Sequence, residues 1–138
     1  MVFNMLNYIQ NCPYLSEIVS NVDFLGKNSY SLSISGRSKD KVVKEYTDGD
    51  SIISSTYTLK LRLPYGVDMN NNLANSRLTE NVEKWFIKNS EGGILPELDE
   101  DKIAISIKLN FLKDEAVYLA DTAVFTADMT ILYYKTKA

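Results

Sequence analysis

The sequence has 138 residues, a length typical of one domain, and its 45% hydrophobic and 24% charged content is typical of a globular chain. The absence of histidine excludes Ser-His-Asp and Cys-His nucleophilic sites, and the single cysteine excludes an internal disulfide and a cysteine-cluster metal site. The formal net charge of −3 gives no indication of a nucleic-acid-binding domain, which is usually basic.

The hydropathy pattern excludes further classes of protein. No apolar run approaches the ~20 residues that a helix needs to cross a bilayer, and the N-terminus has no basic segment followed by an apolar one. We therefore expect a soluble protein that is made in the cytoplasm and has no signal peptide. Histidine is the usual general base near neutral pH, so we expect neither an enzyme nor a cofactor, although catalysis by carboxylates or lysine stays open.

The N-terminal segment is expected to form a helix. Apolar residues between Val2 and Ile9 follow a helical period, and Pro13 stops the helix because the residue before proline is pushed out of the α region. Residues 16–27 fit either a continuation of this helix or a short strand.

Two strands and a loop are expected next. From Asn28 to Ser35 the chain alternates between apolar side chains and serines, which is typical of a strand with one face in a core. Lys41–Tyr46 alternates more weakly and predicts a second strand. Gly36–Asp40, between them, is expected to be a charged loop.

The segment Thr47–Tyr65 gives a clear hairpin signal. Asp48 and Gly49 are typical of a tight turn, because glycine tolerates the positive φ that such turns require. The strand that follows is expected to bury one face, formed by Tyr57, Leu59, Leu61 and Leu63. Its other face is formed by Thr56, Thr58, Lys60 and Arg62.

A second helix is expected to begin at Asn75 or Ser76, either of which can cap it, and to end before Gly92 and Gly93. The preceding residues from Gly66 have no periodicity and are expected to form a loop. The core-facing stripe of the helix is Leu78, Val82, Trp85 and Phe86.

Two strands complete the chain after a connector at 94–98 whose leucines are expected to pack inwards. The first strand is expected to bury Ile103, Ile105, Ile107, Leu109 and Phe111. The second, Thr122–Lys135, is apolar on both sides at its end, which indicates either a central strand or a surface covered by another subunit.

The order helix, three strands, helix, two strands predicts an α+β fold over residues 1–138. We expect a mostly antiparallel sheet with both helices packed on one face. The outer face of the sheet would then be the polar one, with its serines and threonines and with Lys60, Arg62 and Lys108.

Two acidic groups contain the oxygen ligands that hard cations prefer. Asp48 and Asp50 flank Gly49, but the further ligands of an EF-hand loop are missing, so a hairpin turn is the favoured interpretation. The densest acidic group is Glu97, Asp99, Glu100 and Asp101. For this group a solvated loop or a charged contact rim is favoured over a cation site.

The basic segment consists of Arg37, Lys39, Lys41 and Lys44. Phosphate contact is one interpretation, but Asp40 and Glu45 interleave with the basic residues, which favours a solvated or subunit-facing loop. Cys12 is interpreted as a buried spacer and not as a nucleophile. Gly92 and Gly93 follow a helix, so they do not form a phosphate-binding loop.

An ordered set of motifs resembles a known family. The set is Met5–Ile9, Cys12–Leu15, Tyr46–Gly49, Tyr65-Gly66, Glu83–Trp85, Gly93–Leu98 and Ile131–Tyr134. Together these motifs resemble the small tail proteins of phages and phage-like particles from Gram-positive bacteria. Such proteins are often labelled minor capsid or minor tail proteins, and they are similar to the tail-terminator class. The resemblance covers nearly the whole chain.

The resemblance implies a structural function. Tail terminators form hexameric rings that cap the tail tube at its head-proximal end, stop its polymerisation and present a surface to the head connector or collar. It implies an α+β fold, with the tube protein and further copies of the chain as partners, and the sheath as well in contractile tails. It implies no specific nucleic-acid binding and no membrane.

The residues that we expect to make subunit or tube contacts are Arg37, Lys39, Lys41, Lys44, Asp48, Asp50, Lys60, Arg62, Asp99, Glu100 and Asp101. Ring formation needs two different patches on each subunit. We therefore expect the hairpin at 36–55 to contact the acidic residues 99–101 of a neighbouring copy. Two alternatives stay open: another ring-forming connector, such as a head-completion or tail-tube protein, and a small α+β ligand-binding protein or enzyme.

Overall fold

The computed structural model describes residues 1–15, 18–26, 30–66, 69–119 and 121–137, without the side chains of 69–72. Along the described chain the elements are α1 (Val2–Gln10), η1 (Pro13–Leu15), β1 (Val19–Val22), β2 (Ser31–Glu45), β3 (Ser51–Pro64), α2 (Met69–Glu91), β4 (Lys102–Phe111), η2 (Lys113–Glu115), β5 (Val117–Tyr118) and β6 (Thr122–Lys135).

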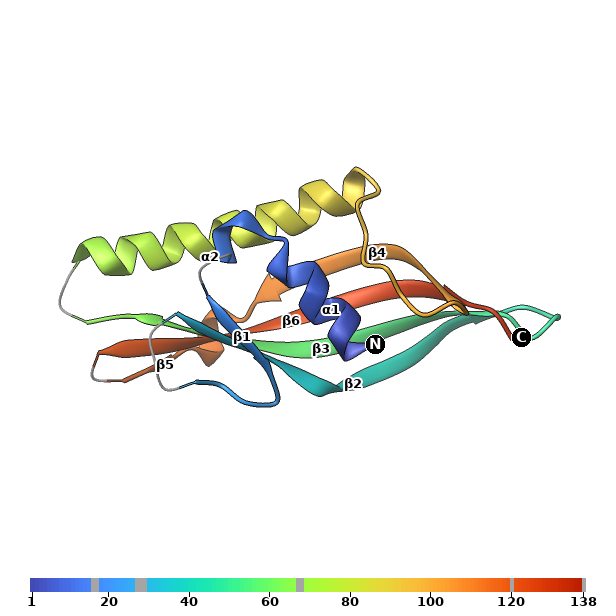
Figure 1. The fold of residues 1–138 in the computed structure, drawn as a ribbon, viewed down its shortest axis with the longest axis horizontal. Helices are drawn as coiled ribbons and strands as arrows, with labels where there is room; N and C mark the ends of the chain where they lie inside the picture. Colours follow the sequence, from blue (N-terminus) through green and yellow to red (C-terminus); the bar gives the residue numbers. More distant parts are fainter. Residues whose placement is uncertain (16–17, 27–29, 67–68, 120, 138) are drawn as a thin grey trace.

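The six strands form one sheet in the order β1-β2-β3-β6-β4, with β5 paired to β6. The β1–β2 pair is parallel and the other pairs are antiparallel. Both helices lie on the same face of the sheet (Figure 1). The predicted α+β fold, with its mostly antiparallel sheet and two helices on one face, is confirmed.

The core lies between the helices and the sheet, where the alternation of the strands predicts it. The predicted faces of β3 and of the second helix are buried: Leu59, Leu61 and Leu63 are at most 1% exposed, and Phe86 is fully buried. Tyr8 of α1 meets Phe86 edge to face, with ring centroids 5.7 Å apart, which ties the two helices together.

The strand β2 is one continuous element, so the predicted loop at 36–40 is wrong. Between Ile34 and Ser38 the register advances four residues on β2 and two on β3, which leaves two extra residues in a bulge. Gly36 lies in this bulge and donates its N–H to Asp23 Oδ1 at 2.6 Å. A charged segment that contains glycine is typical of a loop, but here the bulge accommodates it within a strand.

The helix α2 begins at Met69, six residues before the earliest predicted start. Asn75 does not cap the helix. Its buried side chain donates from Nδ2 to the carbonyl of Pro64, which fastens α2 to the end of β3. Periodicity misses the start because the sequence of the first turns, Met69-Asn70-Asn71-Asn72, carries no apolar stripe.

The helix ends as predicted, in a Schellman arrangement. Ile94 donates its N–H to Asn89 O at 2.8 Å, Gly93 donates to Ser90 O at 3.3 Å, and Gly93 has a φ of +76°. Leu95 and Leu98 then pack against the core, as expected.

We expect Gly93→Ala to destabilise the fold by about 1 kcal/mol, because a Cβ at positive φ is strained even where it meets no neighbour. Denaturant unfolding measures this free energy. Introduction of alanine at an exposed helical position, as in Lys88→Ala, is the control and should change it by less than about 0.5 kcal/mol.

The first residues of β4 do not bury the side chains that the sequence predicts. Ile103 is 63% exposed and Ile105 is 42% exposed, whereas Ile107 is buried. The register between β4 and β6 shifts between Ala104 and Ser106, and this bulge turns Ile103 to the outer face. A bulge of one residue reverses the face of every side chain beyond it, and alternation alone does not reveal it.

The strand β6 is central in the sheet, between β3 and β4. This resolves the two interpretations of its apolar end in favour of a central strand. On the outer face, the serine side of β2 is also less exposed than predicted. Ser31 and Ser33 are buried there, and Ser31 Oγ donates to Gly26 O at 3.0 Å.

Candidate interaction surface

The outer face of the sheet, opposite the helices, carries most of the basic residues that were singled out. Directly paired residues of antiparallel strands point to the same face. The pairs Lys39–Thr56, Lys41–Ser54 and Lys44–Ile52 therefore place three lysines on the side that also carries Lys60. By the same register, Lys108 of β4 lies on this face. We call Lys39, Lys41 and Lys44 the basic row.

A second bulge in β2 completes the basic row. Strict alternation would place Lys44 opposite to Lys39 and Lys41. The register shift between Val42 and Lys44 returns Lys44 to their face. The acidic residues interleaved in the sequence point the other way, since Asp40 pairs with buried Ser55 and accepts its hydroxyl at 2.7 Å. The mixed charge in the sequence is thus separated by face.

The paired ends of β2 and β3, from Ser38 to Tyr57, form what we call the hairpin arm. The end of the sheet that contains it projects beyond both helices (Figure 1). Val42 and Val43 are more than half exposed there. The arm presents charged and apolar side chains at the same end of the molecule, which is the composition of a contact surface.

The turn of the hairpin arm is held by the C-terminal end of β6. Gly49 has a φ of +94°, and Asp50 N donates to Asp48 Oδ1 at 3.0 Å, so the predicted turn is confirmed. Tyr134 donates its hydroxyl to Asp50 Oδ2 at 2.5 Å, and Lys137 N donates to Asp50 Oδ1 at 2.9 Å. These bonds lower the pKa of Asp50, and the bond to Asp50 raises the pKa of Tyr134 to about 12.

This pair predicts how the turn responds to pH. Because the pKa of Tyr134 is raised, its bond contributes to stability at neutral pH and is lost as pH rises towards 12. Because the pKa of Asp50 is lowered, its contribution is lost as the carboxylate is protonated in acid. We expect Asp50→Asn to lower the pKa of Tyr134 towards 10, as measured by the shift of its ring carbons with pH. An unchanged value of about 12 would contradict the assignment.

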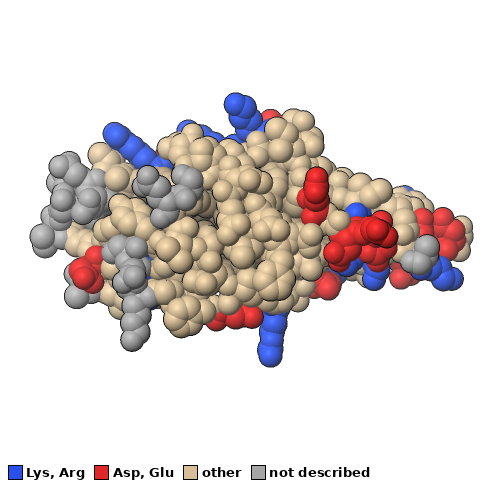
Figure 2. Space-filling model, in the orientation of Figure 1, with Lys and Arg blue, Asp and Glu red and all other residues tan. Residues whose placement is uncertain are grey.

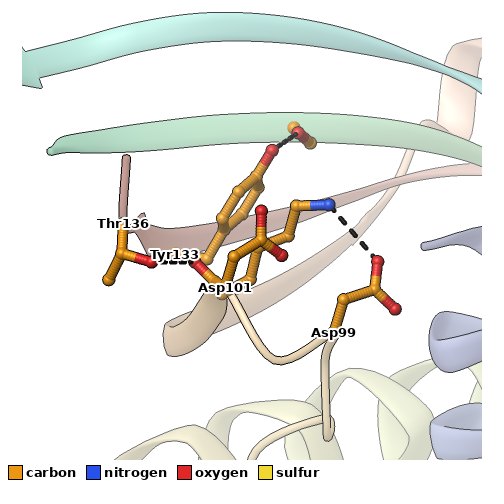
Figure 3. A network of polar contacts seen from close by, with 6 residues as sticks. Asp99, Asp101, Tyr133 and Thr136 are labelled. Atoms are coloured by element: carbon orange, nitrogen blue, oxygen red, sulfur yellow. Dashed lines mark hydrogen bonds and ion pairs between the residues drawn. The ribbon is translucent and has the colours of Figure 1, made fainter. Parts of the chain in front are cut away.

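The acidic rim, defined as Asp99, Glu100 and Asp101, lies at the same end of the sheet, immediately before β4. Asp101 O accepts Thr136 N at 2.9 Å, which ties the rim to the end of β6. Figure 3 shows Asp99 and Asp101 of the rim near Tyr133. Lys102 Nζ lies 3.3 Å from Asp99 Oδ2. The rim and the basic row therefore lie near opposite edges of one end of the sheet.

Charges in the described chain are largely left unpaired within the subunit. Among the described residues, Lys102–Asp99 is the one ion pair within 4.0 Å. Acidic side chains gather over the narrow end of the molecule (Figure 2), where Figure 1 places the hairpin arm. Charged groups that have no partner in their own chain are available to a second molecule.

Several of the predicted contact residues already have side-chain partners in their own chain, among them Arg62, Asp50 and Asp99, which pairs with Lys102. Arg62 donates from Nε to Gly26 O at 2.9 Å and from Nη1 to Thr122 Oγ1 at 3.2 Å, and Asp50 is held by Tyr134. The exposed contact residues include the three lysines of the basic row and also Arg37, Asp48, Lys60 and Glu100. The hydrogen bonds of Arg62 and Asp50 could not be predicted from local sequence, because their partners are 36 and 84 residues away.

Side chains of α2 close part of the free edge of β4. Ile107 N donates to Ser90 Oγ at 3.2 Å, and Phe111 N donates to Glu83 Oε1 at 2.9 Å. These bonds occupy backbone donors that would otherwise be open to another strand. The closure does not extend to the start of β4, where Ile103 and Ile105 are exposed.

A groove of about 290 Å³ lies where α2 passes the ends of β4 and β6. Its lining includes Tyr65, Glu83, Phe111, Tyr118 and Phe125. The carboxylate of Glu83 is engaged by Phe111 N, so the groove offers mainly aromatic and apolar surface.

Cys12, Trp85 and Phe86 have structural roles. Cys12 is buried, and burial raises the pKa of its thiol, as expected for a spacer. Trp85 and Phe86 pack together with ring centroids 5.2 Å apart. In the described residues there is no group of three or more acidic or cysteine side chains placed to hold a metal ion. None of the helices in this part of the chain is long and apolar enough to cross a membrane.

No protein-family model matches the sequence, and no curated protein matches it either.

Proposed function

We propose that the protein is a structural component of a phage or phage-like tail that forms a hexameric ring. The ring would cap the tail tube at its head-proximal end, stop the polymerisation of the tube and join it to the head or collar. The tube protein is the expected partner, with the sheath and the head-connector or collar proteins as further candidates. The chain acts by binding and has no enzymatic role.

One observation of the structure carries this proposal: a basic surface and an acidic surface occupy opposite edges of the same end of one sheet. A cyclic oligomer needs two different and complementary patches on each subunit, because every copy contacts its neighbours head to tail. The assignment to a phage tail and the expected number of six subunits come from the resemblance in the ordered sequence motifs.

Mass photometry of the purified chain tests the ring. We expect a main species of six times the 15.6 kDa of the chain. Because opposite charges contribute, raising the salt concentration from about 0.1 M to 1 M should shift the equilibrium towards monomers, as the Debye length falls from ~10 to ~3 Å. A monomer at all protein concentrations would contradict the proposal.

Further experiments distinguish the proposed cap from two alternative functions. A tube subunit would form rings as well, but it would label the whole length of the tail in electron micrographs. A small ligand-binding protein is favoured by the groove beside α2, and it would be monomeric with that groove as its binding site.

A further inference from the structure

The sheet has two open edges at its hairpin end. On one side, β1 pairs only with Ser31–Ile34, so the edge of β2 from Ser38 to Glu45 has no strand neighbour in the described part of the chain. On the other side, β4 is closed by α2 at Ile107 and Phe111, and Lys102 N donates to Asp99 O at 2.9 Å, but residues 103–106 have no further strand beside them in the described part of the chain. Open strand edges present backbone donors and acceptors that pair with other chains.

The directions of the strands make the two edges compatible. β2 runs antiparallel to β3, β3 to β6 and β6 to β4, so β2 and β4 run in opposite directions. A second copy that lies beside the first, with its helices on the same side, therefore presents its β2 antiparallel to the β4 of the first copy. Antiparallel pairing needs no further rearrangement of either edge.

The charges favour this head-to-tail pairing over a symmetric one. If two β2 edges paired about a two-fold axis, each basic row would lie close to another basic row, which is destabilising. If two β4 edges paired, the basic row of each copy would have no acidic rim of the other copy beside it. Pairing β2 with β4 instead brings the basic row of one copy towards the acidic rim of the next.

The exposed apolar residues agree with the same contact. Val42 and Val43 lie on the open part of β2, and Ile103 and Ile105 lie on the open part of β4. All four are at least 42% exposed in the single chain. Pairing of the two edges would cover these side chains on both faces of the continued sheet, with Val42 on the helix side and Ile103 on the outer face, and would reduce their contact with water.

We propose that a second copy of this chain adds its β2 edge, from Ser38 to Glu45, to the β4 edge at residues 103–106, so that the sheet continues from subunit to subunit. This inference rests on the proposed ring and specifies its interface. The interaction is strand addition, in which main-chain hydrogen bonds supply affinity and the flanking side chains supply specificity.

Site-directed thiol cross-linking tests the pairing. In a Cys12→Ala background, Lys41→Cys and Ile103→Cys place thiols on the outer face of the two edges. A cross-linker that spans about 8 Å reaches both a directly opposite and a diagonal neighbour. The chain that carries both cysteines should give a ladder of covalent oligomers on a denaturing gel. Either cysteine alone should give monomers, and a mixture of the two single variants should give dimers.

Arg77→Cys is the matched control, because this exposed arginine lies on the first half of α2, beside Asn75, which bonds to the end of β3 remote from the hairpin turn. Combined with Ile103→Cys, it should leave the chain monomeric on the gel. Covalent dimers from Lys41→Cys alone would overturn the inference in favour of a symmetric β2–β2 contact. A ring seen by mass photometry without a ladder from the double variant would overturn the inference but not the ring. A monomer by mass photometry would overturn both.

Discussion

Reversing the charge of Lys39 and Lys41 to glutamate is expected to dissociate the ring into monomers. Both side chains belong to the exposed basic row on the outer face of the hairpin arm. The substitutions would place two negative charges near the acidic rim of the neighbouring copy. Like charges at an interface cost several kcal/mol, so we expect each contact to weaken on the order of 100-fold, about 2.8 kcal/mol. Mass photometry at fixed protein concentration measures the loss.

The control for this experiment changes the net charge by the same amount elsewhere. Lys84 and Lys88 are exposed on α2, and their joint reversal should leave the oligomer intact. Reversing Asp99 and Asp101 to lysine in the Lys39→Glu, Lys41→Glu chain should restore the oligomer, because the two patches become complementary again. An oligomer that survives the reversal of Lys39 and Lys41 would show that the basic row is not part of the interface.

Phe86→Ala is expected to destabilise the subunit by about 3–5 kcal/mol. Phe86 is fully buried and contacts the rings of Tyr8 and Trp85, with centroids 5.7 and 5.2 Å away, so its loss leaves a cavity between the two helices and the sheet. Denaturant unfolding of the monomeric Lys39→Glu, Lys41→Glu chain separates this effect from assembly.

Ile87→Ala is the matched control for the cavity. Ile87 follows Phe86 on α2 but is 53% exposed, so its truncation should cost less than about 0.5 kcal/mol. Equal losses for the two variants would contradict the placement of the core stripe.

The buried faces of the elements follow from the sequence wherever one hydrophobic period continues without interruption. Leu59–Leu63 and the stripe that ends at Phe86 are buried as predicted, because local alternation and the helical period determine which side chains face the core. The predicted loop at Gly36 and the predicted burial of Ile105 are wrong. At each of these positions a bulge changes the register, and a bulge depends on the partner strand and not on the local sequence.

The charged residues of the candidate surface could be found from the sequence, but their arrangement could not. The sequence predicts a loop in which basic and acidic residues alternate. In the structure this segment is a strand, which places Lys39 and Lys41 on one face and Asp40 on the other. That the acidic rim lies at the same end of the sheet depends on the pairing of β6 with both β3 and β4. Such long-range pairing is a property of the folded sheet.

The position of the protein in an intact particle tests the proposed cap most directly. A fusion that adds a compact label after residue 138 can be imaged in negatively stained tails, since Lys137, the last described residue, is exposed. The cap predicts label at the head-proximal end of the tail alone. Label distributed along the tube, or absent from purified tails, would contradict it.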